Sequence, residues 1–241
     1  MIPKIIHFCW LSKEEFPEEY KRCMESWKIL EDSGYKFIHW DYDRCKDIIN
    51  YSPFIKKCYE AKAYAFVCDY IRCYVLYHYG GIYLDCDVEV LRSFDDLLHL
   101  PYAISIENKR LNHIEFAIML FSPGNKFLSE MIDFYENYDD LGENYIDIIP
   151  IVALTVLENK LREIYYLKLP EDLEKIIDDY KNLYIFPKEY FSPKAWGSNQ
   201  YTISQNSYTI HHFNGGWVSK GEKNLYKIEP NGIRIDKGES N

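Results

Sequence analysis

The chain lacks both a long apolar run and a cluster of basic residues. No apolar stretch approaches the ~20 residues that a helix needs to span a bilayer, and the N-terminus has no adequate signal-peptide core. The formal net charge of −10 argues against binding to nucleic acid, which needs a basic surface. We therefore expect a cytoplasmic protein with no nucleic-acid partner. A peripheral association with the inner face of the cell membrane stays open.

The chain also lacks cysteines at paired spacing. Its seven cysteines contain no C-x-x-C pair, and an odd number at irregular spacing indicates reduced thiols and argues against zinc. No internal repeat, low-complexity tract or linker is evident, so residues 1–241 are expected to form a single domain with one core. We expect the polar tail after about residue 220 to be mobile.

Predicted strands alternate with predicted helices along the first half of the chain. We predict strands over 4–10, 35–40, 82–85, 102–107 and 116–121, and helices over 17–31, 43–50, 53–59, 62–79 and 126–138. A further helix over 145–160, kinked or divided by Pro150, and short strands over 184–186 and 208–211 follow. This alternation predicts an α/β fold with a mainly parallel central sheet flanked by helices.

Two carboxylates follow the predicted strand 82–85. Gly80 and Gly81 turn the chain, and Asp85 and Asp87 then lie one residue apart at the strand end. Residues i and i+2 of an extended chain point the same way, so both carboxylates can face one cation. Oxygen ligands suit Mg²⁺ or Mn²⁺, which often share a substrate's phosphates. A solvated turn would explain a lone Asp-x-Asp equally well, but carboxyl ends of strands are where α/β folds bind ligands.

The helix before this strand carries Asp69 and Arg72 at positions i and i+3, on one helix face. One interpretation is a local surface ion pair, which contributes little. The other is an acid that holds sugar hydroxyls beside an arginine that grips sugar or phosphate oxygens. The spacing leaves both interpretations open.

Two aromatic segments are further candidates. Histidine can complete a metal site begun by two aspartates, and either His211 or His212 is placed to do so after a late strand. Trp217 can donate its indole N–H to a phosphate. At the end of the first strand, Phe8 or Trp10 can stack on a nucleobase. Ordinary packing would account for each of these side chains as well.

These segments occur in the order and spacing of a known family. The chain resembles glycosyltransferase family 32, sugar transferases with an Asp-x-Asp motif, and is more distantly similar to the catalytic domain of the large clostridial glucosylating toxins. The resemblance rests on residues 2–10, 68–72, 76–77, 79–88 and 210–217, whereas 108–206 carries little signal. Two positions depart from the common pattern: Cys68 and Gly216 stand where relatives often have serine.

The resemblance implies a GT-A-type nucleotide-sugar-binding fold, a UDP-sugar donor, a divalent metal, Mn²⁺ or Mg²⁺, and transfer with retention of anomeric configuration. It implies that Asp87 binds the metal directly with His211 as the third protein ligand, and that Asp85 contacts the metal shell, ribose or sugar. The implied catalytic residues are Asp69, Arg72, Asp85, Asp87 and Trp217. The implied donor-binding residues are Phe8, Trp10, Asp69, Arg72, Tyr83, Asp85, Trp217 and Lys220.

We expect a glycan or lipid-linked glycan as the acceptor, in capsule or lipopolysaccharide synthesis, with a toxin-like protein acceptor as the alternative. No enzymic nucleophile is evident, which favours transfer on the face that the leaving group vacates. An Asp-x-Asp phosphatase is a weaker alternative, because Glu89 stands where such enzymes place Thr or Val. A relative that binds the donor without turnover is a third possibility.

Overall fold

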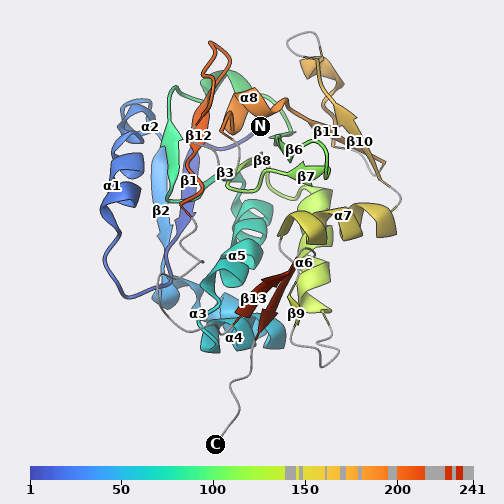
Figure 1. The fold of residues 1–241 in the computed structure, drawn as a ribbon. Helices are drawn as coiled ribbons and strands as arrows, with labels where there is room; N and C mark the ends of the chain where they lie inside the picture. Colours follow the sequence, from blue (N-terminus) through green and yellow to red (C-terminus); the bar gives the residue numbers. More distant parts are fainter. Residues whose placement is uncertain are drawn as a thin grey trace, which may run out of the picture.

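The protein is built around a five-stranded sheet (Figure 1). The computed structural model describes residues 1–138, 145–146, 149–160, 162–168, 172–178, 181–194, 200–214, 226–229 and 232–235. The strand order is β2 (Lys36–Trp40), β1 (Ile5–Cys9), β3 (Gly81–Leu84), β8 (Ile118–Phe121) and β5 (Tyr102–Ala103). β1 pairs in parallel with both β2 and β3, and β8 runs antiparallel to β3 and β5. The α/β fold predicted from the sequence is therefore confirmed.

Helices cover both faces of this sheet (Figure 1). On one face, Trp27 lies between α1 (Glu18–Glu25) and α2 (Lys28–Asp32) and packs its ring edge against Phe8 of β1, with the centroids 5.4 Å apart. On the other face, α5 (Tyr64–Tyr79) contacts β1, β3 and β8. Behind it lie α3 (Tyr42–Tyr51), α4 (Pro53–Glu60), α6 (Lys126–Glu136) and α7 (Ile149–Asn159).

The single helix predicted over 17–31 is wrong, because the structure has two helices with a break at Ser26 and Trp27. Both side chains at the break bind the backbone of β4 (Val88–Val90), a strand that the sequence did not predict. The Trp27 indole donates to the Val88 carbonyl at 2.8 Å, and the Ser26 hydroxyl accepts from the Val90 N–H at 2.8 Å. The break thus docks α1 and α2 onto the strand that follows the Asp-x-Asp segment.

The second half of the chain differs more from the prediction. The strand predicted over 102–107 is divided into β5 and β6 (Ile106–Asn108), because β6 leaves the central sheet to pair with β7 (His113–Ile114). Pro150 neither kinks nor divides a helix but lies in the first turn of α7, where a proline is tolerated. The remaining elements are β9 (Tyr145–Ile146), β10 (Glu163–Tyr166), β11 (Asn182–Ile185), α8 (Lys188–Phe191), β12 (Thr209–His211), β13 (Tyr226–Glu229) and β14 (Gly232–Ile235), with 3₁₀ turns at Asp95–Leu97 and Leu173–Lys175.

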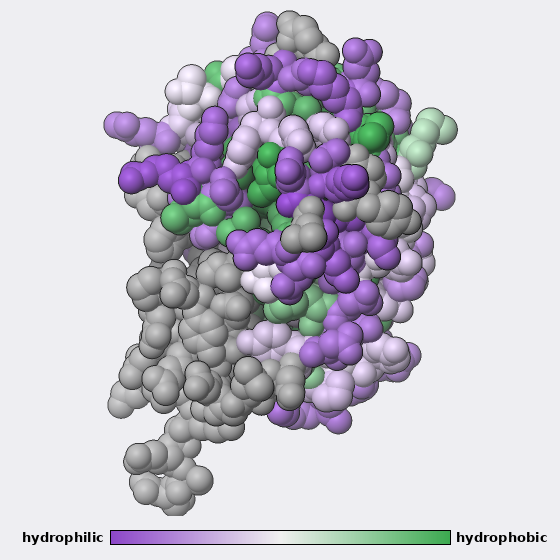
Figure 2. Space-filling view, turned by 90° about the vertical axis from the view of Figure 1, so that its right-hand side faces the viewer, coloured by the Kyte–Doolittle hydropathy of each residue, from purple (hydrophilic) through white to green (hydrophobic). Residues whose placement is uncertain are grey.

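In the part of the face that Figure 2 colours, hydrophilic side chains surround small hydrophobic areas. Among the described residues, no helix combines the length and apolar character that crossing a membrane requires. All seven cysteines are free thiols.

The turn between α5 and β3 requires glycine. Gly80 and Gly81 have φ of +61° and +113°, and a Cβ on Gly81 would lie 2.6 Å from the Ile5 carbonyl oxygen of β1. This close approach lets β3 enter the sheet beside β1 and so fixes where the Asp-x-Asp segment begins.

We predict that Gly81→Ala lowers the free energy of unfolding by at least about 2 kcal/mol, through both the positive φ and the backbone clash. Gly34→Ala is the matched control, because Gly34 also has a positive φ, +83°, but no atom within 4 Å of the added Cβ. It should cost about 1 kcal/mol. Equal losses for the two variants in denaturant unfolding would contradict the role of the close approach.

His7 joins the same turn to the sheet. The ring is fully buried on β1, its Nδ1 accepts the Trp40 indole N–H at 3.0 Å, and its Nε2–H therefore donates to the Gly80 carbonyl at 2.9 Å. Burial lowers the pKa of His7 from 6.5 to about 4, although the bond to Gly80 acts in the opposite direction. The imidazole is thus neutral in the folded protein.

Because the unfolded chain protonates His7 below pH 6.5 and the folded chain does so only near pH 4, its contribution to stability is complete above pH 6.5 and is lost as the pH falls to about 4. We predict that this loss amounts to about 3 kcal/mol. Other buried acids titrate in the same range, so the measure is the difference in unfolding free energy between wild type and His7→Gln at each pH. A difference that does not change between pH 7 and pH 4 would contradict the prediction.

Candidate active site

Asp85 and Asp87 lie at the carboxyl end of β3, where the chain turns into β4. The Asp85 N–H donates to the Ala117 carbonyl at 2.8 Å, and the Asp85 carbonyl accepts the Val88 N–H at 3.0 Å. The turn therefore begins in register with the sheet. Both aspartates, with His211, offer ligand atoms that all lie within 4.8 Å of one another.

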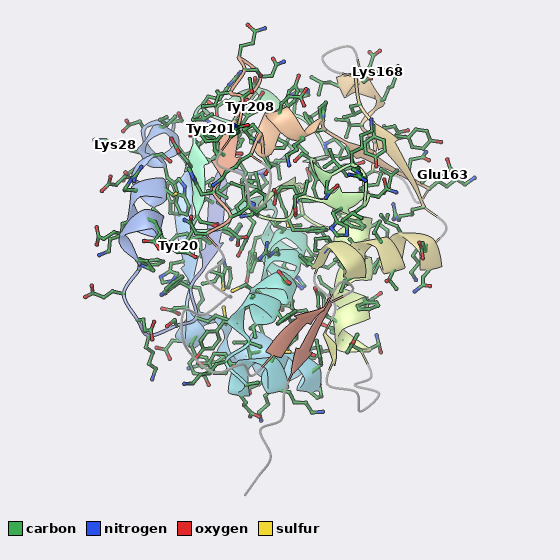
Figure 3. The ribbon with its side chains drawn as sticks, in the orientation of Figure 1. Tyr20, Lys28, Glu163, Lys168, Tyr201 and Tyr208 are labelled. Atoms are coloured by element: carbon green, nitrogen blue, oxygen red, sulfur yellow. The ribbon has the colours of Figure 1, made fainter. Side chains whose placement is uncertain are left out.

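His211 reaches this turn through strand pairing. β12 runs antiparallel to β4, so that His211 lies opposite Val88, next to Asp87. Before β12, Tyr208 lies beside α8 (Figure 3), and its N–H donates to the Tyr190 carbonyl at 2.7 Å. His212, the other candidate, instead bonds Glu89 through Nε2 at 2.8 Å. Of the two histidines, the structure thus brings His211 to the aspartates.

The turn after β12 also contacts Asp87. The Asn214 N–H donates to the Asp87 carboxylate at 2.9 Å, and the His212 N–H donates to the Asp87 carbonyl at 3.1 Å. Phe213 has a φ of +55°, unusual for a residue with a side chain, and its ring lies on His211 with the centroids 3.9 Å apart. The strained turn therefore holds both the histidine and the aspartate.

The electrostatics of the cluster favour a cation. Burial alone would raise the pKa of Asp87, but the charge of His211 and hydrogen bonds from His211 and the Asn214 N–H lower it below its usual range. Burial likewise lowers the pKa of His211, whereas Glu115 and Asp87 raise it well above its usual value and prevail. Two carboxylates and one imidazole nitrogen form a donor set that Mn²⁺ or Mg²⁺ can use, with further positions left for phosphate oxygens.

Asp69 and Arg72 do not form a surface ion pair, because both are buried on α5, at 7% and 6% exposure. Arg72 Nη2 lies 3.0 Å from the Asp69 carboxylate, and Nη1 lies 3.3 Å from Asp85 and 2.7 Å from the Phe116 carbonyl. Burial raises the pKa of Asp69 to about 7, although the Arg72 charge acts in the opposite direction. The guanidinium therefore joins α5 to the Asp-x-Asp turn.

Tyr83 belongs to the same network. Its buried hydroxyl donates to Asp85 at 3.0 Å, and the Arg72 guanidinium lies over its ring, 4.7 Å from the centroid. Burial raises the pKa of Asp85, and the charge of Arg72 offsets part of this effect. The arrangement fixes Asp85 from two sides.

The aromatic candidates differ in accessibility. Phe8 is 9% exposed and stacks on His39, with the ring centroids 4.8 Å apart. This agrees with ordinary packing, the alternative to stacking on a nucleobase. Trp10 is only partly buried, beside Phe16 at 4.7 Å and Tyr20 at 5.6 Å. Tyr20 lies on α1 (Figure 3), and its pKa is raised by burial and then by the charges of Asp87 and Asp85. The aromatic cluster around Trp10 is therefore close enough to the carboxylates to feel their charge. Trp217 and Lys220 lie outside the described residues.

Residues 115–117, before β8, were not identified from the sequence as part of the site, although a strand was predicted over 116–121. The Phe116 carbonyl accepts from Arg72, the Ala117 carbonyl accepts from the Asp85 N–H, and Glu115 bonds His211 Nδ1 at 3.2 Å. One short segment thus contacts three parts of the site. No local pattern could have revealed it, because each partner is distant in sequence.

Part of this chain is similar in sequence to known proteins. Residues 17–103, which include Asp69, Arg72, Asp85 and Asp87, match the family model described as glycosyltransferase sugar-binding region containing DXD motif. Inositol phosphoceramide mannosyltransferase 3 of Schizosaccharomyces pombe is 33% identical over 54% of this chain and 36% of that protein. Inositol phosphoceramide mannosyltransferase 1 of the same yeast is 31% identical over 64% of this chain and 48% of that protein.

An uncharacterised glycosyltransferase of Acanthamoeba polyphaga mimivirus is 32% identical over 49% of both chains. The solved structure of the PaToxG glycosyltransferase aligns with 66% of this chain and 70% of that one, with a TM-score of 0.49 and 16% identity. The chain spans about a third to a half of the length of the curated relatives named here. The resemblance predicted from the sequence is confirmed over residues 17–103, which match the model of a glycosyltransferase sugar-binding region with a DXD motif.

Proposed function

We propose that this protein is a metal-dependent glycosyltransferase that moves a sugar from a UDP-sugar to a glycan or lipid-linked glycan. The observation that carries the proposal is the convergence of Asp85, Asp87 and His211 beside the buried Asp69–Arg72 pair. The matched sugar-binding region, residues 17–103, contains Asp69, Arg72, Asp85 and Asp87. His211 joins them from outside this region.

Asp87 and His211 would hold the metal, which would act as a Lewis acid toward the charge left on the departing diphosphate. The low pKa of Asp87 keeps its carboxylate ionised and able to ligate. Asp85 lies between the cluster and Arg72: its Oδ2 is 3.3 Å from the guanidinium and its Oδ1 accepts the Tyr83 hydroxyl at 3.0 Å. These two contacts would keep its carboxylate directed toward the metal position. Retention and transfer on the vacated face stay predictions.

Arg72 would act mainly by orienting the carboxylates of Asp69 and Asp85. Its Nη1 and Nη2 are already engaged by Asp85, the Phe116 carbonyl and Asp69. The hydroxyls of the donor sugar would then meet two carboxylates that Arg72 fixes, Asp69 on α5 and Asp85 after β3. Trp10, the more exposed of the two aromatic candidates, is the better placed to stack on the base.

A lipid-linked acceptor is favoured by the relatives. Two of them are named for mannosyl transfer to inositol phosphoceramide, a lipid. This favours a lipid-linked acceptor over a protein side chain, and it makes mannose a candidate for the transferred sugar. The bacterial capsule or lipopolysaccharide setting has no counterpart among these names and stays a prediction.

The test is a panel of UDP-sugars and nucleotide-activated mannose, scored by release of nucleoside diphosphate with Mn²⁺, and with a chelator in its place. We predict release with at least one donor and its loss on chelation. Release of phosphate from a phosphomonoester without any nucleotide sugar would favour the phosphatase alternative. Donor binding without release would favour an inactive relative.

We predict that Asp87→Asn lowers Mn²⁺-dependent release at least about 100-fold, because the amide lacks the negative charge that ligates the ion. This loss is larger than the one usually caused by changing a residue that contacts a metal ligand but not the metal. Asp47→Asn is the control, since Asp47 is an exposed aspartate on α3 and should leave the rate unchanged. Full metal-dependent release by Asp87→Asn would show that the site is wrongly assigned.

A further inference from the structure

Glu115 lies on the far side of the His211 ring from the aspartates. His211 Nε2 is 3.5 Å from the Asp87 carboxylate, and Nδ1 is 3.2 Å from Glu115 Oε2. The imidazole thus lies between two carboxylates, that of Asp87 beside the candidate metal position and that of Glu115 at the opposite edge of the ring. Glu115 is neither among the residues that the family resemblance implies nor among the proposed donor contacts.

The Glu115 carboxylate is itself held firmly. The residue is 1% exposed, its Oε1 accepts the Ala117 N–H at 2.9 Å, and its own N–H donates to the Ser105 carbonyl at 2.8 Å. Both carboxylate oxygens are therefore engaged, one by the backbone and one by the histidine. A buried acid with two fixed partners cannot turn away from His211 without leaving a buried N–H unpaired.

We infer that Glu115 is a positioning residue, which orients His211 as a metal ligand by accepting its Nδ1–H. With Nδ1 committed as a donor to Glu115, Nε2 is the nitrogen on the side of Asp85 and Asp87, and a metal that displaces its proton would meet the lone pair there. Histidine ligands commonly donate their other ring N–H to a carboxylate, which fixes ring orientation and raises ligand basicity. The inference rests on the proposed metal-dependent function and assigns a residue that the matched region, 17–103, does not contain.

Phe213 supplies a second, independent restraint. Its ring lies against His211, 3.9 Å between centroids, and limits the tilt of the imidazole. Glu115 then selects which nitrogen keeps its proton when a metal displaces the other. Packing alone would not distinguish the two ring nitrogens, so the carboxylate is the group that decides which of them faces the metal.

The test variant is Glu115→Gln. Glutamine has one acceptor oxygen where glutamate has two, so it can satisfy either the Ala117 N–H or His211 Nδ1–H, and its NH₂ group must face the other donor. We predict that the affinity for Mn²⁺, titrated calorimetrically into the full chain, falls about 10- to 100-fold. Glu115→Asp keeps two acceptor oxygens and should recover part of this loss.

Glu89→Gln is the matched control. Glu89 also pairs with a histidine, His212, at 2.8 Å, but that pair lies outside the candidate metal cluster. Its Mn²⁺ affinity should stay within about twofold of wild type, as for most partly exposed substitutions. A second readout is the nitrogen NMR shifts of the His211 ring with Mg²⁺ bound, which should show the proton on Nδ1 in wild type and its displacement in Glu115→Gln.

The outcomes are distinct. If wild type binds Mn²⁺ and Glu115→Gln binds it equally well, the role of Glu115 is refuted and the proposed function stands. Equal weakening by Glu89→Gln would also refute it, because any loss of negative charge would then suffice. If wild type binds no Mn²⁺, both the inference and the metal dependence of the proposed function fail. If Glu115→Gln misfolds, the wild-type shifts decide: a His211 ring that carries its proton on Nε2 with Mg²⁺ bound would refute the inference.

Discussion

The candidate site depends on the pairing of β12 with β4. This ladder carries His211 to Asp87, and the chain that leaves it returns the Asn214 N–H to the same carboxylate, from 127 positions away in the sequence. The pairing is short, only three residues in each strand, and is supported by Trp27 and Ser26 on the β4 backbone. The contacts made at the break between α1 and α2 therefore also support the side chains of the candidate metal site.

Charge explains why this arrangement calls for a ligand. Among the residues that the structure describes, Asp69, Asp85, Asp87 and Glu115 converge on two cationic side chains, Arg72 and His211. Burying more carboxylates than cations costs free energy, and the raised pKa values of Asp69 and Asp85 express that cost. A divalent cation with the phosphates of a donor would offset the excess, in line with the proposed function.

The parts of the site that could be predicted from sequence are those with a local pattern. The glycine pair, the apolar strand and the two aspartates lie within eight consecutive residues, and Asp69 and Arg72 share one helix face, so spacing alone places them. Glu115 could not be predicted, because its partner His211 lies 96 residues further along the chain and nothing near Glu115 marks it. The break between α1 and α2 was missed for the same reason, since it satisfies bonds to β4 and not a local preference.

The most direct test of the account is a crystal structure with Mn²⁺ and UDP, with the ion located by its anomalous scattering. The account predicts one strong peak within bonding distance of the Asp87 carboxylate and His211 Nε2, with diphosphate oxygens as further ligands and the base next to Trp10. A manganese peak elsewhere, or UDP bound with no ion between it and Asp87, would contradict the central claim that these residues form a metal–diphosphate site.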